Sequence, residues 1–221
     1  MRQFNDYELI IFDCDGVILD SNTLKIDAMK NALSEFELSA TKIDECVTFF
    51  TNNFGKSRFY HVDHFVDNLL NIELTHVEQF KSNLLASYSE KCKSLYLLAK
   101  SSPFINEVLS KSTALKYVAS GSEQQELRNV FQQRKLDVYF QDVLGSPEKK
   151  VNHVRHVLAK HTSSTAVMIG DAVSDLEAAK DNNIDFIFYS PFSNVKDIML
   201  TLCAKHHYRV INSFEEVLNE L

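Results

Sequence analysis

An apolar run, Leu9–Phe12, ends directly in two aspartates, Asp13 and Asp15, which only one residue separates. A short run of apolar, β-prone residues predicts a buried strand. Carboxylates at the end of a buried strand lose hydration, and two of them repel each other unless a cation compensates their charge. The stretch therefore restricts the chain to folds in which a buried strand opens onto a polar site.

Further apolar, β-rich runs follow in the second half of the chain, where they alternate with helical patterns. The predicted strands are Leu9–Phe12, Leu115–Ala119, Ala166–Ile169, Phe186–Tyr189 and Tyr208–Ile211, and the predicted helices are Gln124–Lys135, Glu148–His161, Asp175–Asn182 and Phe214–Leu221. Such alternation is typical of a parallel sheet covered by helices on both faces. We therefore predict an α/β fold with a doubly wound, Rossmann-like core.

The segment between the first two predicted strands contains helical patterns only. These predicted helices are Thr23–Phe36, Thr41–Phe49, Ser57–Asn71 and Thr75–Leu98. Because a crossover between parallel strands needs far fewer residues, we predict a helical cap domain inserted after the first strand. The expected domains are a core of residues 1–19 and 100–221 and a cap of residues 20–99, with hinges near Asp20–Thr23 and Lys100–Pro103.

The composition argues against several classes of protein. The chain has 221 residues, 45% of them hydrophobic and 24% charged, as in ordinary globular proteins. Its net charge of -7 disfavours nucleic-acid binding through a broad basic surface. No apolar run approaches the roughly 18 residues of a membrane span, and MRQFNDYELI does not resemble a signal peptide, so we expect a soluble, cytoplasmic protein without a membrane partner. The spacing of Cys14, Cys46, Cys92 and Cys203 suits neither a zinc site nor a disulfide scaffold, which predicts reduced, buried thiols.

Polar residues follow several of the predicted strands. They are Asp13, Asp15 and Gly16 after the first strand, Ser120, Gly121 and Ser122 after the second, where we expect a helix to begin, Gly170 and Asp171 followed by Ser174 and Asp175, and Lys149 and Lys150 after Gly145-Ser146-Pro147. Ligands of open parallel sheets bind beyond the carboxyl ends of the strands. Taken singly, a serine here can be a helix N-cap and Asp175 can complement a helix dipole, but their convergence on one edge favours a site.

This set of side chains suits phosphoryl transfer through a covalent intermediate. One carboxylate can act as the nucleophile and a second as general acid and base. Oxygen ligands such as Asp13, Asp171 and Asp175 indicate Mg²⁺ rather than zinc. Ser120 and backbone amides can bind the phosphate, and a lysine can stabilise the charge of the transferring group.

Four segments, DCDGVILDS, ASGS, GSPEKK and GDAVSD, resemble in order and spacing the signature motifs of the haloacid dehalogenase superfamily. The resemblance is greatest to its phosphatases of the phosphoglycolate phosphatase and β-phosphoglucomutase type, whose helical cap follows the first strand. It implies that Asp13 is the nucleophile and that Asp15 is the general acid/base, with a backbone carbonyl that binds Mg²⁺. It also implies phosphate binding by Ser120 and Gly121.

The same resemblance implies that Asp171 and Asp175 complete the Mg²⁺ shell begun by Asp13 and Asp15. The spacing from Ser146-Pro147 favours Lys150 as the active-site lysine, with Lys149 as the alternative.

The cap segment Asn53–Arg58 resembles a substrate-binding loop of β-phosphoglucomutase-like caps, which suggests that Lys56 and Arg58 bind a second anionic group of the substrate. The alternative is that both are solvated charges before a helix whose N-cap is Ser57. Lys25 stands where the mutases carry a histidine, which favours hydrolysis. A phosphonatase with a Schiff base on Lys56 or Lys25 is a further alternative, and dehalogenation is disfavoured by the predicted Mg²⁺ shell.

We therefore predict a Mg²⁺-dependent phosphatase that hydrolyses a small phosphorylated metabolite, with a sugar phosphate as one candidate. The alternatives are a phosphomutase of the β-phosphoglucomutase type and a non-catalytic module that binds a phosphometabolite or a protein. His61, His64 and the aromatic residues of the cap are expected to pack its helices. The sequence identifies neither the substrate nor the oligomeric state.

Overall fold

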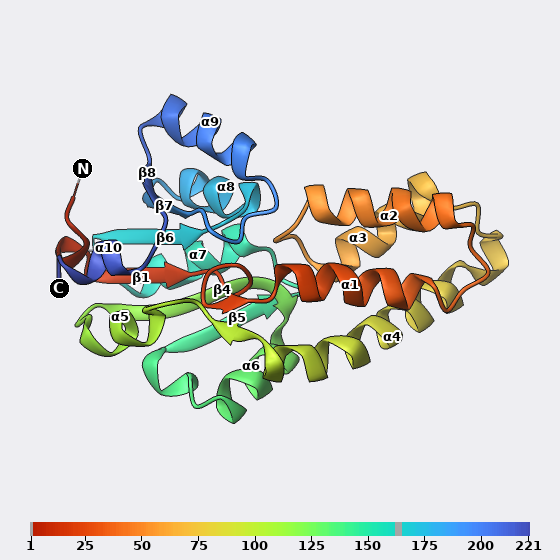
Figure 1. The fold of residues 1–221 in the computed structure, drawn as a ribbon, viewed down its shortest axis with the longest axis horizontal. Coiled ribbons are helices and arrows are strands. Elements are labelled where there is room, and N and C mark those ends of the chain that lie inside the picture. Colours follow the sequence, from red (N-terminus) through yellow and green to blue (C-terminus); the bar gives the residue numbers. More distant parts are fainter. Residues whose placement is uncertain (1, 162–164) are drawn as a thin grey trace.

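A parallel sheet of six strands forms the centre of the core in the computed structural model, which describes residues 2–161 and 165–221 (Figure 1). The strands are β1 (Leu9–Phe12), β4 (Leu115–Glu123), β5 (Asp142–Ser146), β6 (Ala166–Gly170), β7 (Asp185–Tyr189) and β8 (Arg209–Ile211). Their order across the sheet is β5-β4-β1-β6-β7-β8, and each neighbouring pair is parallel. The order reverses at β1, which lies between β4 and β6, so the predicted doubly wound α/β core is confirmed.

Side chains of β1 alternate between the two faces of the sheet, and each face has its own apolar core. Ile10 and Phe12 belong to the core beneath α5 (Ile105–Lys111), α6 (Gln124–Gln133) and α10 (Glu215–Leu218). Leu9 and Ile11 belong to the core beneath α7 (Lys150–Lys160), α8 (Val173–Asp181) and α9 (Lys196–His206). All four side chains are fully buried, and burying each stabilises the fold by about 1.5–3 kcal/mol. This burial fixes the end of β1, and with it Asp13.

A helical cap is inserted after β1, as the sequence predicts, and extends from the carboxyl end of the sheet (Figure 1). Its helices are α1 (Asn22–Leu33), α2 (Ala40–Asn52), α3 (Arg58–His64) and α4 (Val77–Leu98), and the short antiparallel strands β2 (Leu19–Asp20) and β3 (Lys100–Ser101) join it to the core. The short helical turns are Phe4–Asp6, Phe65–Leu69, Leu74–His76 and Asp137–Tyr139. Ser39 and Ser57 are the N-caps of α2 and α3, and each hydroxyl accepts a hydrogen bond from the backbone of the first turn. Aromatic pairs fill the interior, with the rings of Phe50 and Phe54 5.6 Å apart.

The C-terminus of α4 is anchored to the core by Arg134, the residue that ends α6. The Arg134 guanidinium donates hydrogen bonds to the carbonyl oxygens of Tyr96, at 2.8 Å, and Ala99, at 2.6 Å, and to the hydroxyl of Ser101, at 3.1 Å. The last carbonyls of a helix have no partner within the helix, so a cation at this position satisfies them. Arg134 therefore stabilises the junction at which the chain returns from the cap.

Some elements differ from the sequence predictions. Strand β5 and helices α5 and α9 were not predicted; β5 has only two strongly apolar residues, Val143 and Leu144, between polar or small ones. The prediction that Ser120–Ser122 open a helix is wrong, because these residues continue β4. The helix begins at Gln124, since the Glu123 carboxylate accepts hydrogen bonds from the first amides of α6.

The four cysteines are buried and unpaired, as predicted, two in the cap (Cys46 and Cys92) and two in the core (Cys14 and Cys203). Burial raises the pKa of the Cys46 thiol to about 12 and that of Cys203 to about 11. Among the described residues, none of the helices is long and apolar enough to cross a lipid bilayer. The cytoplasmic location expected from the sequence stays a prediction.

Candidate active site

The turn after β1 brings Asp13 and Asp15 to the carboxyl edge of the sheet. Gly16 follows them with a φ of 74°, a left-handed conformation that favours glycine. A Cβ at this position would also collide with the side chains of Asp171 and Asn22. The Gly16 amide then donates a hydrogen bond of 2.8 Å to the carbonyl of Leu19, which closes the turn beside the site.

Three buried carboxylates meet at this edge. Oxygen atoms of Asp13, Asp171 and Asp175 all lie within 4.8 Å of one another. Asp171 follows β6, and Asp175 lies in the first turn of α8, where its Oδ2 accepts hydrogen bonds from the amides of Asp171, at 3.1 Å, and Ala172, at 3.0 Å. Within residues 2–161 and 165–221, Asp13 Oδ2 and Asp171 Oδ1 are buried without a hydrogen-bond partner. Buried oxygens of this kind are costly unless they bind a cation, so the cluster fits Mg²⁺.

Burial and the charges of neighbouring carboxylates raise the pKa of two of these residues, Asp13 and Asp171. Burial and then the charge of Asp175 raise the pKa of Asp13, although Lys150 opposes the shift. Burial and the charges of Asp13 and Asp175 likewise raise the pKa of Asp171. A divalent cation among the carboxylates would favour their ionised forms.

Lys150 supplies a positive charge at this cluster. Its Nζ lies 3.0 Å from Asp13 Oδ1 and also contacts Asp175 Oδ1. Burial alone would lower the pKa of Lys150, but the charges of Asp13 and Asp175 outweigh it and raise the pKa. The structure therefore brings Lys150 to Asp13, while Lys149 lines a cavity outside the cluster.

The Asp15 carboxylate is held by four side chains. Its oxygens accept hydrogen bonds from Ser21 Oγ at 2.6 Å, Lys25 Nζ at 2.9 Å, Tyr96 Oη at 2.9 and 3.0 Å, and Ser122 Oγ at 2.8 Å. Burial alone would raise the pKa of Asp15, but the Lys25 charge and the hydrogen bonds lower it. Ser21 and Lys25 lie at the start of the cap and Tyr96 lies at its end, so the Asp15 carboxylate contacts both segments that connect the cap to the core.

Sequence reasoning missed most of this network. The sequence predicted for Lys25 only the position of a mutase histidine or a Schiff-base lysine, whereas its pairing with Asp15 follows from its place one turn into α1, beside the Asp15 turn. Ser122 stands two residues after Ser120, and residues two apart on a strand share a face, a signal that was available. Tyr96 carries no sequence signal, because 81 residues separate it from Asp15. Asn22 was also missed; its side-chain amide donates a hydrogen bond of 2.7 Å to Asp171 Oδ2.

Two predicted phosphate-binding residues, Ser120 and Gly121, lie near the end of β4. The buried Ser120 hydroxyl accepts a hydrogen bond of 3.1 Å from the Ser122 amide. Gly121 lies against the cap, since a Cβ there would overlap the carbonyl oxygen of Gly55 and lie 2.8 Å from that of Lys56. Gly121 therefore allows the cap loop to approach the core.

The two predicted substrate-binding cations of the cap lie in different environments. Lys56 is exposed, and its Nζ lies 4.7 Å from the centre of the Tyr60 ring. Arg58 is only 5% exposed and forms a bidentate ion pair with Glu126 of α6, with N–O distances of 3.0 and 2.7 Å. The alternative prediction of solvated charges is therefore wrong for Arg58.

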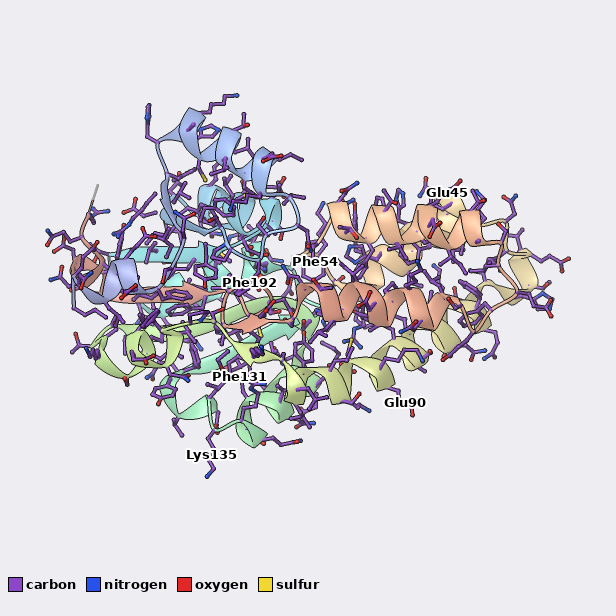
Figure 2. The ribbon with its side chains drawn as sticks, viewed as in Figure 1. Glu45, Phe54, Glu90, Phe131, Lys135 and Phe192 are labelled. Carbon is purple, nitrogen blue, oxygen red and sulfur yellow. The ribbon has the colours of Figure 1, made fainter. Side chains whose placement is uncertain are left out.

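A small cavity of about 10 Å³, enough for roughly one water molecule, lies between the cap and the aspartates that follow β1. Asp13 and Asp15 line it from the core, and Lys25, Arg58 and Phe54 line it from the cap. Phe54 lies where the cap meets the core (Figure 2). An adjoining outer cavity of about 320 Å³ is lined by residues that include Lys56 and Lys149, and the two cavities share the Gly55–Lys56 loop and Gly121.

His61 fixes the cap loop that faces the core. Its Nδ1 lies 2.9 Å from the carbonyl oxygen of Ser57 and its Nε2 3.2 Å from that of Asn53. Burial lowers the pKa of His61 to about 4, although both carbonyls oppose the shift. His64 stacks on Phe49 with ring centres 3.6 Å apart. Both histidines therefore pack within the cap, as the sequence analysis expected.

Comparison with known proteins gives a consistent result. The family model for haloacid dehalogenase-like hydrolases matches residues 10–189. Among solved structures, a predicted phosphatase from Clostridium acetobutylicum is 18% identical, with 97% of each chain covered and a TM-score of 0.75. A predicted phosphoglycolate phosphatase from Haemophilus somnus 129pt is 16% identical, with 97% of each chain covered and a TM-score of 0.71. CbbY from Rhodobacter sphaeroides, in complex with phosphate, is 15% identical over 96% of each chain, with a TM-score of 0.66. A search of curated protein sequences gave no significant match.

Proposed function

The chain belongs to the haloacid dehalogenase-like hydrolase family, and on that premise we propose that it is a Mg²⁺-dependent phosphatase acting on a small phosphorylated metabolite. The observation that carries the proposal is the cluster of Asp13, Asp171 and Asp175, whose oxygens lie within 4.8 Å of one another, with Lys150 3.0 Å from Asp13. Similar folds named as predicted phosphatases, and one that was crystallised with phosphate, support it.

The proposed reaction begins at Asp13. Lys150 and the Cys14 amide, at 3.0 and 2.7 Å, both contact Asp13 Oδ1 and leave Oδ2 unpaired. A carboxylate oxygen of Asp13 attacks phosphorus, so that an aspartyl phosphate forms while the ester oxygen–phosphorus bond breaks. Mg²⁺, held by Asp13, Asp171, Asp175 and the backbone carbonyl of Asp15, would neutralise the phosphate charge.

Asp15 serves as the acid and then as the base. Once it has left the Lys25 contact that lowers its pKa and has bound a proton, it gives that proton to the departing ester oxygen, and it then takes one from the water that attacks the aspartyl phosphate. Phosphate leaves, and Asp13 is regenerated. Ser120 and the Gly121 amide are proposed to bind the phosphate, and Lys150 stabilises the charge that develops on it. To reach the substrate, the Asp15 carboxylate must leave at least part of its present hydrogen-bond network.

The proposal is tested by replacing the nucleophile. Asp13→Asn should lower Mg²⁺-dependent hydrolysis of p-nitrophenyl phosphate at least about 1000-fold, since it removes the group that forms the covalent intermediate. Asp44→Asn, at a side chain 69% exposed on the cap, is the matched control and should retain wild-type turnover. Turnover that persists in a folded Asp13→Asn protein would refute the proposal.

A second experiment separates the phosphatase from the two alternative functions. A screen of phosphorylated metabolites scored for phosphate release and for isomerisation distinguishes a phosphatase from a phosphomutase. Binding of Mg²⁺ and phosphate esters without turnover would instead indicate a non-catalytic module.

A further inference from the structure

Three cationic residues of the cap, Lys25, Lys56 and Arg58, line the catalytic cavity. They differ in whether a carboxylate of the protein neutralises their charge. Lys25 is paired with Asp15 at 2.9 Å, and Arg58 is paired with Glu126 at 2.7 Å. Lys56 is exposed, and its Nζ contacts the Tyr60 ring, toward the outer cavity. The two buried cap cations therefore already have internal anions.

The buried ion pair of Arg58 and Glu126 has the same geometry as the contact between an arginine and an anionic substrate. Both terminal nitrogens of the guanidinium donate to the two oxygens of one carboxylate, at 3.0 and 2.7 Å, and the two side chains are only 5% and 13% exposed. The Ser89 hydroxyl donates to the same carboxylate, and the Tyr88 ring lies 4.9 Å from the guanidinium. This fork-to-carboxylate geometry is the one by which arginine recognises anionic ligands.

Glu126 belongs to α6 of the core, whereas Arg58 belongs to α3 of the cap. The pair therefore forms where the cap meets the core, and it is intact in the arrangement that encloses the catalytic cavity. Arg58 lines the cavity, so a second anion on a substrate would meet there a guanidinium whose charge Glu126 already neutralises. An anion that loses its hydration without gaining a free cation is disfavoured, and such a cost is a common source of specificity.

We propose that Glu126 is a specificity-determining residue, which occupies Arg58 and so selects phosphate monoesters whose leaving group is uncharged, such as polyol or sugar monophosphates. The proposal rests on the phosphatase function described above. It replaces the sequence-based expectation that Arg58 binds a second anionic group of the substrate.

The test uses two esters with the same carbon skeleton, glycerol 3-phosphate and 3-phosphoglycerate, which differ by a carboxylate. Each is measured as an inhibitor of Mg²⁺-dependent p-nitrophenyl phosphate hydrolysis by the full chain, so that neither needs to be the natural substrate. Wild type should bind glycerol 3-phosphate at least about tenfold more tightly, because the carboxylate of 3-phosphoglycerate would lose hydration beside an arginine that Glu126 already neutralises.

Glu126→Gln frees Arg58 and should shift the ratio of the two inhibition constants at least about tenfold toward 3-phosphoglycerate. The double variant Arg58→Met/Glu126→Gln should lose that shift, which separates the effect of the freed charge from a general disturbance of the cap. Thermal unfolding checks that each variant is folded, and the wild-type ratio tests the proposal even where a variant does not fold.

Equal or absent inhibition of wild type by the two esters, or an unchanged ratio in folded Glu126→Gln, would overturn the proposal. Neither result touches the phosphatase assignment, because that assignment fails only if Mg²⁺-dependent hydrolysis is missing or survives in Asp13→Asn.

Discussion

Replacement of Gly121 by alanine tests how closely the cap must approach the core for catalysis. Gly121 is not among the glycines with positive φ, so its backbone suits alanine and only the added methyl group matters. That methyl group would lie 2.8 Å from the carbonyl oxygen of Lys56 and would overlap that of Gly55. Both obstacles are cap backbone, which cannot rotate away as a flexible side chain can.

The size of the effect follows from these contacts. Restoring an ordinary contact of about 3.4 Å with the Lys56 carbonyl requires the cap loop to retreat by about 0.6 Å, and the Gly55 carbonyl requires more. A misplacement of about 1 Å in a catalytic site costs on the order of 100-fold in rate. We therefore expect Gly121→Ala to lower kcat/KM by about 10- to 100-fold, with the core otherwise intact.

The assay combines steady-state hydrolysis of the best phosphate ester with thermal unfolding. Gly145→Ala is the contrasting variant, because its methyl group would meet Ser122 and Gln124 of the core, so overpacking should lower stability by about 1–3 kcal/mol. A Gly121→Ala enzyme with wild-type kcat/KM would refute the view that this glycine sets the approach of the cap.

Three further changes have defined expected outcomes. Lys150→Met leaves the buried charges of Asp13 and Asp175 uncompensated. It should therefore lower kcat at least about 100-fold and lower the free energy of unfolding, measured by denaturant titration, by about 3–5 kcal/mol. A fully active variant would exclude a role for this cation. The pKa of His61 is about 4 in the folded protein and 6.5 ordinarily, so the unfolded chain binds a proton at this residue more tightly than the folded protein does. The free energy of unfolding should therefore fall by up to about 3 kcal/mol as the pH decreases from 6.5 to 4. The difference in unfolding free energy between wild type and His61→Gln should shrink over that range, and parallel pH curves would contradict this. Asp171→Asn should stabilise the protein in chelator, because burial and two neighbouring carboxylates raise the pKa of Asp171. It should also abolish the rise in Tm that Mg²⁺ causes in wild type, which corresponds to about 2.7 kcal/mol of unfolding free energy at a hundredfold excess of Mg²⁺ over its Kd. An equal rise in both proteins would exclude Asp171 from the metal site.

The main features of the fold could be predicted because each depends on local sequence. The run Leu9–Phe12 and the alternating strands and helices after residue 115 specify a parallel sheet, and four helical patterns in succession specify the inserted cap. The position of Asp13 next to Asp171, Asp175 and Lys150 follows from the rule that strand ends of a parallel sheet share an edge.

The rest depends on how the cap lies on the core, which no local pattern encodes. Arg58 and Glu126 are 68 residues apart in the chain, and nothing in either segment indicates that they pair. The same holds for the contact of Tyr96 with Asp15. Strand β5 escaped prediction because Val143 and Leu144 are too short a run to be distinguished from a loop.

The burial of every cysteine makes the chain suitable for site-specific fluorescent labelling. Cys14, Cys46, Cys92 and Cys203 are all inaccessible, so a maleimide dye would leave the native thiols unmodified. A cysteine introduced at Glu45, on the outer surface of the cap (Figure 2), and another at the exposed Gln133 on α6 would then carry a donor and an acceptor without prior removal of native thiols. Energy transfer between them would report the opening and closing of single molecules during turnover.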